Sequence, residues 1–169
     1  MFTEPKIDER PDTHYVGIRT MASLQEMGNG LIPRLHTEVY TWLKQQGVPP
    51  AGAPFIRYHV INMETKLDIE LGVPVAGPIP DDERVRAGVL PAGRYASLIF
   101  TGIENGIKGN GMLLDWGAEH GLKWDTFEAE GGDGFVSRYE SEITDPADEP
   151  DPSKWDTEVA IRIADEPTH

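Results

Sequence analysis

Glu140 is the side chain in this sequence best suited to chemistry, because it is a carboxylate among apolar neighbours. It lies within Phe135–Ile143, where apolar and charged residues alternate as they do in a β-strand whose two faces differ. An ionised carboxylate in such a place must be paired or partly hydrated. It could hold an organic cation, activate a water molecule as a general base, or form only a cross-strand salt bridge with Arg57 or Arg138.

Aromatic side chains could complete a site around this carboxylate. Trp116, Trp155, Trp42 and Tyr95 offer ring faces, and each face next to an organic cation contributes about 0.5–2 kcal/mol. Trp42 and Trp116 fall on predicted helices, where a tryptophan usually packs into a core. Trp155 precedes the last predicted strand and could form a lid, while the Tyr95 hydroxyl could meet a ligand or a backbone carbonyl.

Two further titratable residues are candidates for the site. His59 could carry a proton in catalysis or merely accept a hydrogen bond, and Glu142 could be a second carboxylate or a solvated charge at the rim. The histidines show no metal-ligand spacing, and the sequence contains neither a cysteine nucleophile nor a Gly-x-Ser-x-Gly motif. We therefore expect neither a metal site nor a cofactor.

The composition limits the classes of partner. Fifteen basic and 29 acidic residues give the 169-residue chain a formal charge of −14, which repels nucleic acid phosphates and attracts cations. No stretch approaches the length of an apolar membrane span, the first residues contain no secretory signal, and there is no cysteine. We expect a cytoplasmic protein that binds neither nucleic acid nor membranes.

The secondary structure that must position these residues is predicted from hydrophobic periodicity and from the turn residues. Residues 1–13 are expected to be an irregular lead-in and residues 125–134 a glycine-rich loop. Helices are predicted at 29–46 and 105–120. Strands are predicted at 14–20, 55–62, 67–75, 85–101 with a bend at 91–93, 135–143 and 156–164.

Matching motifs in the same order indicate an internal duplication, with a polar linker between the copies at residues 76–83. The matches pair Tyr15 with Tyr95, Asn29-Gly30-Leu31 with Asn105-Gly106-Ile107, Trp42 and Gly47 with Trp116 and Gly121, Arg57-Tyr58-His59 with Arg138-Tyr139-Glu140, and Asp68–Val73 with Asp156–Ile161.

We therefore predict an α+β fold built from a duplicated βαββ unit, with pseudo-repeats at about 10–76 and 84–164. Two antiparallel sheets with one helix each would be related by a pseudo-two-fold axis, and a central ligand cleft would lie between the faces that the helices leave uncovered. In this alignment Glu140 and His59 are equivalent and face the cleft, whereas Tyr58 and Tyr139 face the helices.

Several of these segments resemble the GyrI-like small-molecule-binding domain, which is also the effector-binding domain of bacterial multidrug-sensing transcription activators. They are Pro91-Ala92-Gly93-Arg94-Tyr95, the run from Glu140 to Asp145-Pro146, and Trp155-Asp156-Thr157-Glu158-Val159. The resemblance covers roughly residues 5–164, so we treat residues 1–169 as a single domain.

The resemblance implies a duplicated βαββ fold with a central hydrophobic pocket for lipophilic, often cationic, aromatic compounds. The pocket glutamate of the family falls on Glu140, and an aromatic residue that follows it falls on Trp155. Glu142 stands where the family usually has tyrosine, which adds a possible second carboxylate.

Two functions are implied. The first is multidrug binding, for sensing or sequestration, with Glu140 as counter-charge and Trp116, Trp155 and Tyr95 as stacking faces. The second is hydrolysis, because standalone members of the family open the cyclopropane of DNA-alkylating natural products. Glu140 would then activate water, and Tyr95 or His59 would donate to the oxygen that gains charge. No helix-turn-helix precedes the domain, so we do not expect a complete transcription activator, and the ligand and any partner protein stay open.

Overall fold

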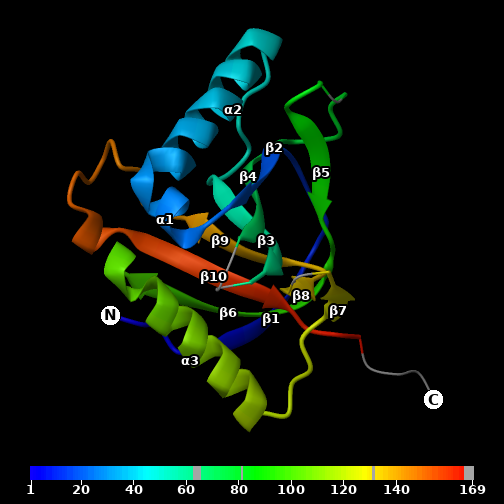
Figure 1. The fold of residues 1–169 in the computed structure, drawn as a ribbon, viewed down its shortest axis with the longest axis vertical. Coiled ribbons are helices and arrows are strands. Elements are labelled where there is room, and N and C mark those ends of the chain that lie inside the picture. The colour runs from blue at the N-terminus through cyan, green and yellow to red at the C-terminus, as the bar shows by residue number, and fades with distance from the viewer. Residues whose placement is uncertain (63–65, 81, 131, 166–169) are drawn as a thin grey trace.

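A computed structural model describes residues 1–62, 66–80, 82–130 and 132–165 (Figure 1). Its elements in chain order are β1 (Lys6–Arg10), β2 (Thr13–Ala22), α1 (Leu24–Glu26), η1 (Met27–Leu31), α2 (Ile32–Gln46), β3 (Phe55–Ile61), β4 (Leu67–Pro74), β5 (Arg86–Leu90), β6 (Gly93–Thr101), η2 (Ile103–Asn105), α3 (Gly106–Glu119), β7 (Thr126–Ala129), β8 (Gly132–Phe135), β9 (Arg138–Glu142), η3 (Pro152–Lys154) and β10 (Asp156–Arg162).

The predicted helices and most predicted strands are present, but several segments differ from expectation. Residues 1–13 contain β1, and residues 125–134 contain the antiparallel pair β7 and β8 instead of a loop. The predicted strand 135–143 is broken by a bend at residues 136 and 137, so that β8 ends at Phe135 and β9 begins at Arg138.

The first helical segment begins earlier than predicted because Ser23 caps it. The Ser23 hydroxyl oxygen accepts from the Glu26 backbone N–H at 3.1 Å, and Glu26 Oε1 accepts from the Ser23 N–H at 3.0 Å, which is a capping box. The chain then leaves helical geometry at Asn29 and Gly30, where Gly30 has a φ of 87°, and α2 follows this kink. The described helices include none that is both long and apolar enough to cross a membrane.

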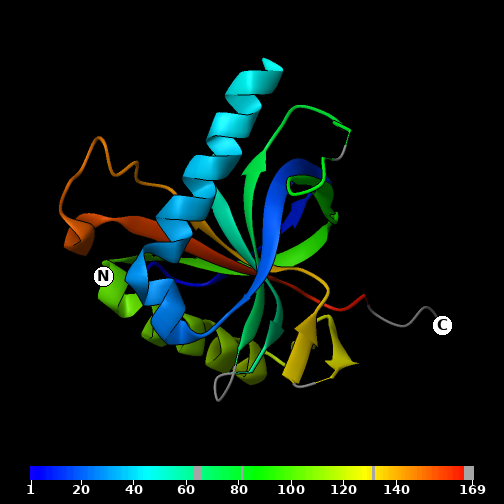
Figure 2. The same ribbon diagram turned by 45° about the horizontal axis from the view of Figure 1, so that its top comes forward.

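The two halves join edge to edge in one antiparallel sheet of ten strands, with the order β1-β6-β10-β9-β3-β4-β2-β5 along its main path. The central pair is β3 and β9, one from each half, and β8 extends the same side of β3. Strands of both halves meet at the centre of the molecule, and α2 and α3 lie over different halves (Figure 2). The α+β class and the duplicated architecture are confirmed, and the two predicted sheets are continuous with each other through the pairing of β3 with β9.

The outermost strand of each half is supplied by the other half. β1 precedes β2 in the chain but pairs with β6, and β5 precedes β6 but pairs with β2. Each exchanged strand is followed by a short connection that contains proline, at residues 11–12 and 91–92. The exchange interlocks the two repeats at both edges of the sheet.

Both helices cover the same face of the sheet. One row of register partners crosses six strands on that face, and it is apolar except at Glu140. The row runs Leu98, Val159, Glu140, Ile56, Leu71 and Ile18. Val159 and Leu98 belong to the core under α3, and Leu71 and Ile18 to the core under α2. Glu140 therefore lies where the two cores meet.

The register corrects the predicted equivalence of Glu140 and His59. Leu71 pairs with Ile56 in the first half, and its equivalent Val159 pairs with Glu140 in the second, so Glu140 is the counterpart of Ile56. These two residues also pair directly with each other, which places them at the pseudo-two-fold axis. A register shift between Tyr58 and Val60 gives β3 an irregularity that the sequence alignment did not anticipate.

The predicted faces of the tyrosines are corrected in part. Tyr58 packs toward the helix-covered core, as predicted, but it shares that face with Glu140. Tyr139 lies on the opposite face, in a buried cluster with Phe55 and Tyr95. The prediction that Tyr139 and Glu140 lie on opposite faces of the strand was therefore correct. The prediction that Tyr139 faces the helices was wrong, because Glu140 does.

The opposite face of the sheet depends on one glycine for its packing. A Cβ atom at Gly72 would lie 2.5 Å from Cζ of Phe55 and 3.0 Å from Cδ2 of Tyr15, and both rings are almost fully buried. We expect Gly72→Ala to lower the free energy of unfolding by about 1–3 kcal/mol, the usual cost of overpacking. Urea unfolding followed by circular dichroism measures this change.

Gly111→Ala is the matched control, because no described atom beyond its own helix lies within 4 Å of a Cβ built there. This substitution in the interior of α3 is expected to stabilise the protein by up to about 1 kcal/mol through helix propensity. Equal effects of the two substitutions would contradict the packing described for Gly72.

Candidate ligand-binding site

A cavity of about 470 Å³ lies on the helix-covered face, over the junction of the two halves. Its walls come from η1 and the start of α2, from β3, from the start of α3, and from β9 with the segment that leads into β10. This volume is within the usual range for small-molecule pockets, and most of its lining is apolar. The cleft lies where the repeats meet, as predicted, but under the helices instead of on the uncovered face.

Glu140 projects into this cavity from the centre of the sheet and accepts a short hydrogen bond from the Tyr58 hydroxyl. Burial raises the pKa of Glu140 above its ordinary value, although the Tyr58 hydrogen bond and the positive charge of Arg138 act against this rise. The Arg138 guanidinium donates to Asn110 Oδ1 at 2.9 Å and lies over the Phe135 ring. The site thus has one central carboxylate that a phenol orients.

Tyr58 remains a hydrogen-bond donor at neutral pH. Burial raises its pKa well above the ordinary value, and the negative charge of Glu140 raises it further. The phenol therefore keeps its proton and directs it at the carboxylate. Sequence reasoning missed Tyr58 because the tyrosine was aligned with Tyr139, although its position two residues from Ile56, on the same strand face, was the available signal.

Glu142 is a second carboxylate that lines the same cavity, two residues along β9. Burial, followed by the charge of Glu140, raises the pKa of Glu142 to about 7. His36, which is buried on α2, places its Nδ1 atom 3.8 Å from Glu142 Oε1. His36 Nε2 lies 3.0 Å from the Phe55 carbonyl oxygen and donates to it, since a carbonyl can only accept.

Trp155 lines the cavity from the segment before β10. Its indole N–H donates to the Glu149 carbonyl oxygen at 2.6 Å, and its own carbonyl accepts from the Gly102 N–H at 2.8 Å. These bonds fix the ring against two neighbouring loops. Trp155 and Glu140, both sequence candidates, therefore share one cavity.

Tyr95 and His59 are placed on the opposite face of the sheet, away from this cavity. The Tyr95 hydroxyl donates to the Pro91 carbonyl oxygen at 2.6 Å and lies 2.8 Å from the Ser137 hydroxyl. His59 Nε2 lies 2.8 Å from Glu70 Oε1, and the same oxygen accepts from the Tyr15 hydroxyl at 2.6 Å. Both residues serve polar networks that stabilise the buried uncovered face.

Arg57 is also outside the cavity, so it does not neutralise Glu140. Its guanidinium donates to the Tyr15 hydroxyl at 2.8 Å and to the carbonyl oxygens of Val89 and Val136 at 3.0 and 2.8 Å. The cross-strand salt bridge that was considered as an alternative role for Glu140 is thus not formed with Arg57.

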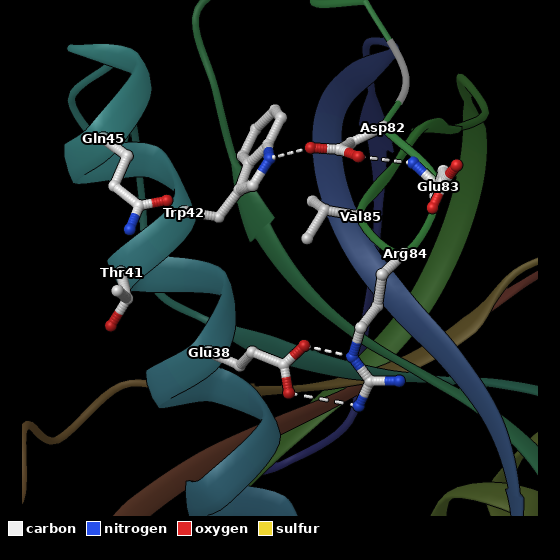
Figure 3. Close-up of a pocket in the computed structure, with 8 residues that line it drawn as sticks. All are labelled: Glu38, Thr41, Trp42, Gln45, Asp82, Glu83, Arg84 and Val85. Carbon is white, nitrogen blue, oxygen red and sulfur yellow. Dashed lines mark hydrogen bonds and ion pairs between the residues drawn. The ribbon is translucent and has the colours of Figure 1, made fainter.

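Trp116 and Trp42 do not line the cavity either. Trp116 packs on the core under α3 and stacks on His120, with ring centroids 4.3 Å apart. Trp42 is partly buried against the core under α2, and its indole N–H donates to Asp82 Oδ2 at 2.8 Å (Figure 3). Their positions on helix surfaces away from the helix starts account for the difference, because only the starts of the helices reach the cavity.

The groove beside Trp42 is a hollow of about 420 Å³, but three of the charged side chains that line it, Glu38, Asp82 and Arg84, already have partners. Glu38 and Arg84 form an exposed ion pair across it, and Asp82 also accepts from the Glu83 backbone N–H at 2.6 Å (Figure 3). The cavity around Glu140 is the better candidate because its carboxylate is central and enclosed by apolar side chains.

Comparison with known proteins agrees with this architecture. A family profile described as the GyrI-like small molecule binding domain matches residues 3–164. A comparison with curated protein sequences finds no match.

Several solved structures share the fold. The EcmrR C-terminal domain aligns with a TM-score of 0.72 and 16% identity, over 96% of this chain and 98% of that domain. In the EcmrR–DNA complex the TM-score is 0.74 at 19% identity, and this chain spans 57% of the EcmrR chain.

Two other similar structures have been solved as a hydrolase and as a ligand complex. A hydrolase from Listeria innocua aligns with a TM-score of 0.62 and 12% identity, covering 95% of this chain and 92% of its own. SAV2435 bound to tetraphenylphosphonium aligns with a TM-score of 0.60 and 11% identity, covering 96% of this chain and 94% of the SAV2435 chain. At these identities the likeness establishes the fold alone.

The cavity carboxylates predict a pH dependence of stability. The pKa of Glu142 is raised to about 7 from 4.5, so the folded protein holds this proton more tightly than the unfolded chain does. The associated stability is fully present below pH 4.5 and is lost as the pH rises through 7. We expect Glu142→Gln, which stays neutral, to become progressively more stable than the wild type between pH 5 and 8, by on the order of 1–2 kcal/mol after allowance for solvent screening.

Urea unfolding at several pH values measures this difference. Glu119→Gln, which removes an exposed carboxylate at the end of α3, controls for the change in net charge. A difference between wild type and Glu142→Gln that does not vary with pH would contradict the raised pKa.

Proposed function

The chain belongs to the GyrI-like small-molecule-binding family, and on that premise we propose that it binds lipophilic aromatic cations in the cavity around Glu140. The observation that carries the proposal is a single carboxylate at the centre of an apolar row, opening into a cavity of about 470 Å³. Drug sensing or sequestration would be the biological use of such binding.

The interior of the cavity suits a delocalised cation better than a neutral or anionic compound. A carboxylate in apolar surroundings attracts a positive charge strongly because little water screens it. A large aromatic cation loses little hydration on entry and gains contact with Trp155, Tyr58 and Phe100. The formal charge of −14 adds a long-range attraction for the same class of ligand.

The complex of SAV2435 with tetraphenylphosphonium supports this choice of ligand class, because that protein shares the fold and was solved with a lipophilic aromatic cation. We extend this ligand class to the present chain because of the local chemistry of Glu140. We assign Glu140 as the counter-charge, Tyr58 as the group that orients it, and Trp155 as the stacking face.

A second candidate function is hydrolysis of a strained cyclopropane, and the raised pKa of Glu140 favours it. A carboxylate of raised pKa can take a proton from water as the water oxygen attacks a ring carbon and the ring bond breaks. The electron pair would pass to a conjugated oxygen of the substrate. The Tyr58 hydroxyl could donate there once Glu140 is protonated, a role earlier considered for Tyr95 or His59.

The binding proposal predicts that Glu140→Gln weakens tetraphenylphosphonium binding by about 10–100-fold, since one buried charge interaction is lost. Binding of triphenylphosphine oxide, which is neutral, should change little. Isothermal titration calorimetry measures the affinities, and the cation should quench tryptophan fluorescence in the wild type but much less in Trp155→Phe. Glu119→Gln is the charge-matched control, and an equal loss for the cation and the neutral compound would refute charge pairing.

The hydrolase candidate predicts that the protein converts a cyclopropane-containing DNA-alkylating natural product into its ring-opened water adduct. The conversion should fall by at least about 100-fold in Glu140→Gln, because the general base is removed. Mass spectrometry of the products over time measures the rate. Product formation no faster than in a protein-free control would exclude this function and leave the binding proposal intact.

A further inference from the structure

Glu142 gives the cavity a second negative position in line with the first. Both carboxylates lie on the same face of β9, with Cα atoms two residues apart, or about 7 Å in a strand. Glu142 is the counterpart of Tyr58 in the other repeat, so the pair is a departure from the internal symmetry. The cavity continues past Glu142 toward Thr144 and Pro146, with Trp155 on its wall.

The neighbour of Glu142 favours a proton on this carboxyl group. His36 gives its Nε2–H to the Phe55 carbonyl, so its Nδ1 atom presents a lone pair to Glu142 Oε1 at 3.8 Å. Two acceptors facing each other repel unless a proton lies on one of them. Burial lowers the pKa of His36 and, with the charge of Glu140, raises that of Glu142 to about 7, so the carboxyl is the group that carries it.

We infer that the cavity prefers aromatic dications to monocations, with one positive charge at Glu140 and the second displacing the proton of Glu142. This inference rests on the proposed cation-binding function and names its ligand class. A rigid ligand with its charges at opposite ends of two linked rings suits two carboxylates that are spaced along a strand. A monocation needs only Glu140 and leaves the Glu142 proton in place.

Among the residues that the structure describes, none places a fixed cation close to Glu142, and several acidic groups favour a second positive charge there. Arg138 lies two residues before Glu140 on β9, where its guanidinium donates to Asn110 Oδ1 and lies over the Phe135 ring. The titratable and charged groups that face Glu142 from the packed elements are His36 and Tyr40 on α2, Tyr58 on β3, Glu140 on β9, Asp145 in the loop after it and Asp156 at the start of β10. Only His36 among these can become positive, and its pKa is lowered.

A matched pair of probes tests the inference. N-methyl-4-phenylpyridinium and 1,1′-dimethyl-4,4′-bipyridinium have nearly the same shape but carry one and two positive charges. In the wild type at pH 8, we expect the dication to bind at least tenfold more tightly by calorimetry. Its affinity should fall about tenfold between pH 8 and pH 6, because the proton of Glu142 then competes, while that of the monocation stays nearly constant.

Substitutions and proton counting complete the experiment. Glu142→Gln should reduce the affinity for the dication to that for the monocation and abolish the pH dependence of dication binding. Glu140→Gln should weaken the binding of both probes. Titrations in buffers of different ionisation enthalpy should show about half a proton released per dication bound in the wild type at pH 7, and none released by the monocation. Circular dichroism and retained tetraphenylphosphonium binding establish that Glu142→Gln is folded.

The possible failures are distinguishable. If tetraphenylphosphonium binds but the dication has no advantage, or keeps its advantage in Glu142→Gln, the dication inference is overturned and the proposed function stands. If tetraphenylphosphonium and both pyridinium probes fail to bind, the proposed function fails and the inference fails with it.

Discussion

The burial of one carboxylate between two apolar cores is the constraint on which the site depends. Glu140 occupies the single charged position in a row that is otherwise made of Leu, Ile and Val side chains. Removing such a group from water costs several kcal/mol unless hydrogen bonds or opposite charges offset the loss. Tyr58 and Arg138 offset it in part, and the cavity leaves one side of the carboxylate accessible. A stable core alone would be better served by another leucine.

The duplicated architecture explains why this position is special. Ile56 and Glu140 are equivalent in the two repeats and pair with each other at the pseudo-two-fold axis. The next residues on the same faces of these strands, Tyr58 in β3 and Glu142 in β9, are equivalent as well. The repeats therefore share a backbone but differ in chemistry at the axis, with a phenol and an alkyl group on one side and two carboxylates on the other. The site arises from that difference and not from the duplication.

The sequence was sufficient for the fold class and for the alternation that separates Glu140 from Tyr139. It was insufficient for deciding which face the helices cover, because Tyr139 is apolar enough for either core and the uncovered face is itself buried by aromatic rings. His59 was misplaced because the repeats were aligned on Tyr58 and Tyr139, whereas the strand pairing makes Glu140 the counterpart of Ile56, and because the cleft lies under the helices and not on the face where His59 lies. β1 was missed because an edge strand with one neighbour needs few apolar residues, and Lys6–Arg10 is mostly exposed.

The exchange of β1 and β5 between the repeats has a consequence for how the chain assembles. Neither repeat contains all the strands that pair with its own strands. The outer partner of β6 is β1, from the N-terminus, and the outer partner of β2 is β5, from beyond the mid-chain linker. If the first repeat emerged from the ribosome before the second, one edge of β2 would expose unpaired backbone N–H and C=O groups. The polypeptide must be synthesised past the mid-chain linker and through β5 before that edge is paired, and β1 is paired only once β6 follows, so the two copies mature as one intertwined body.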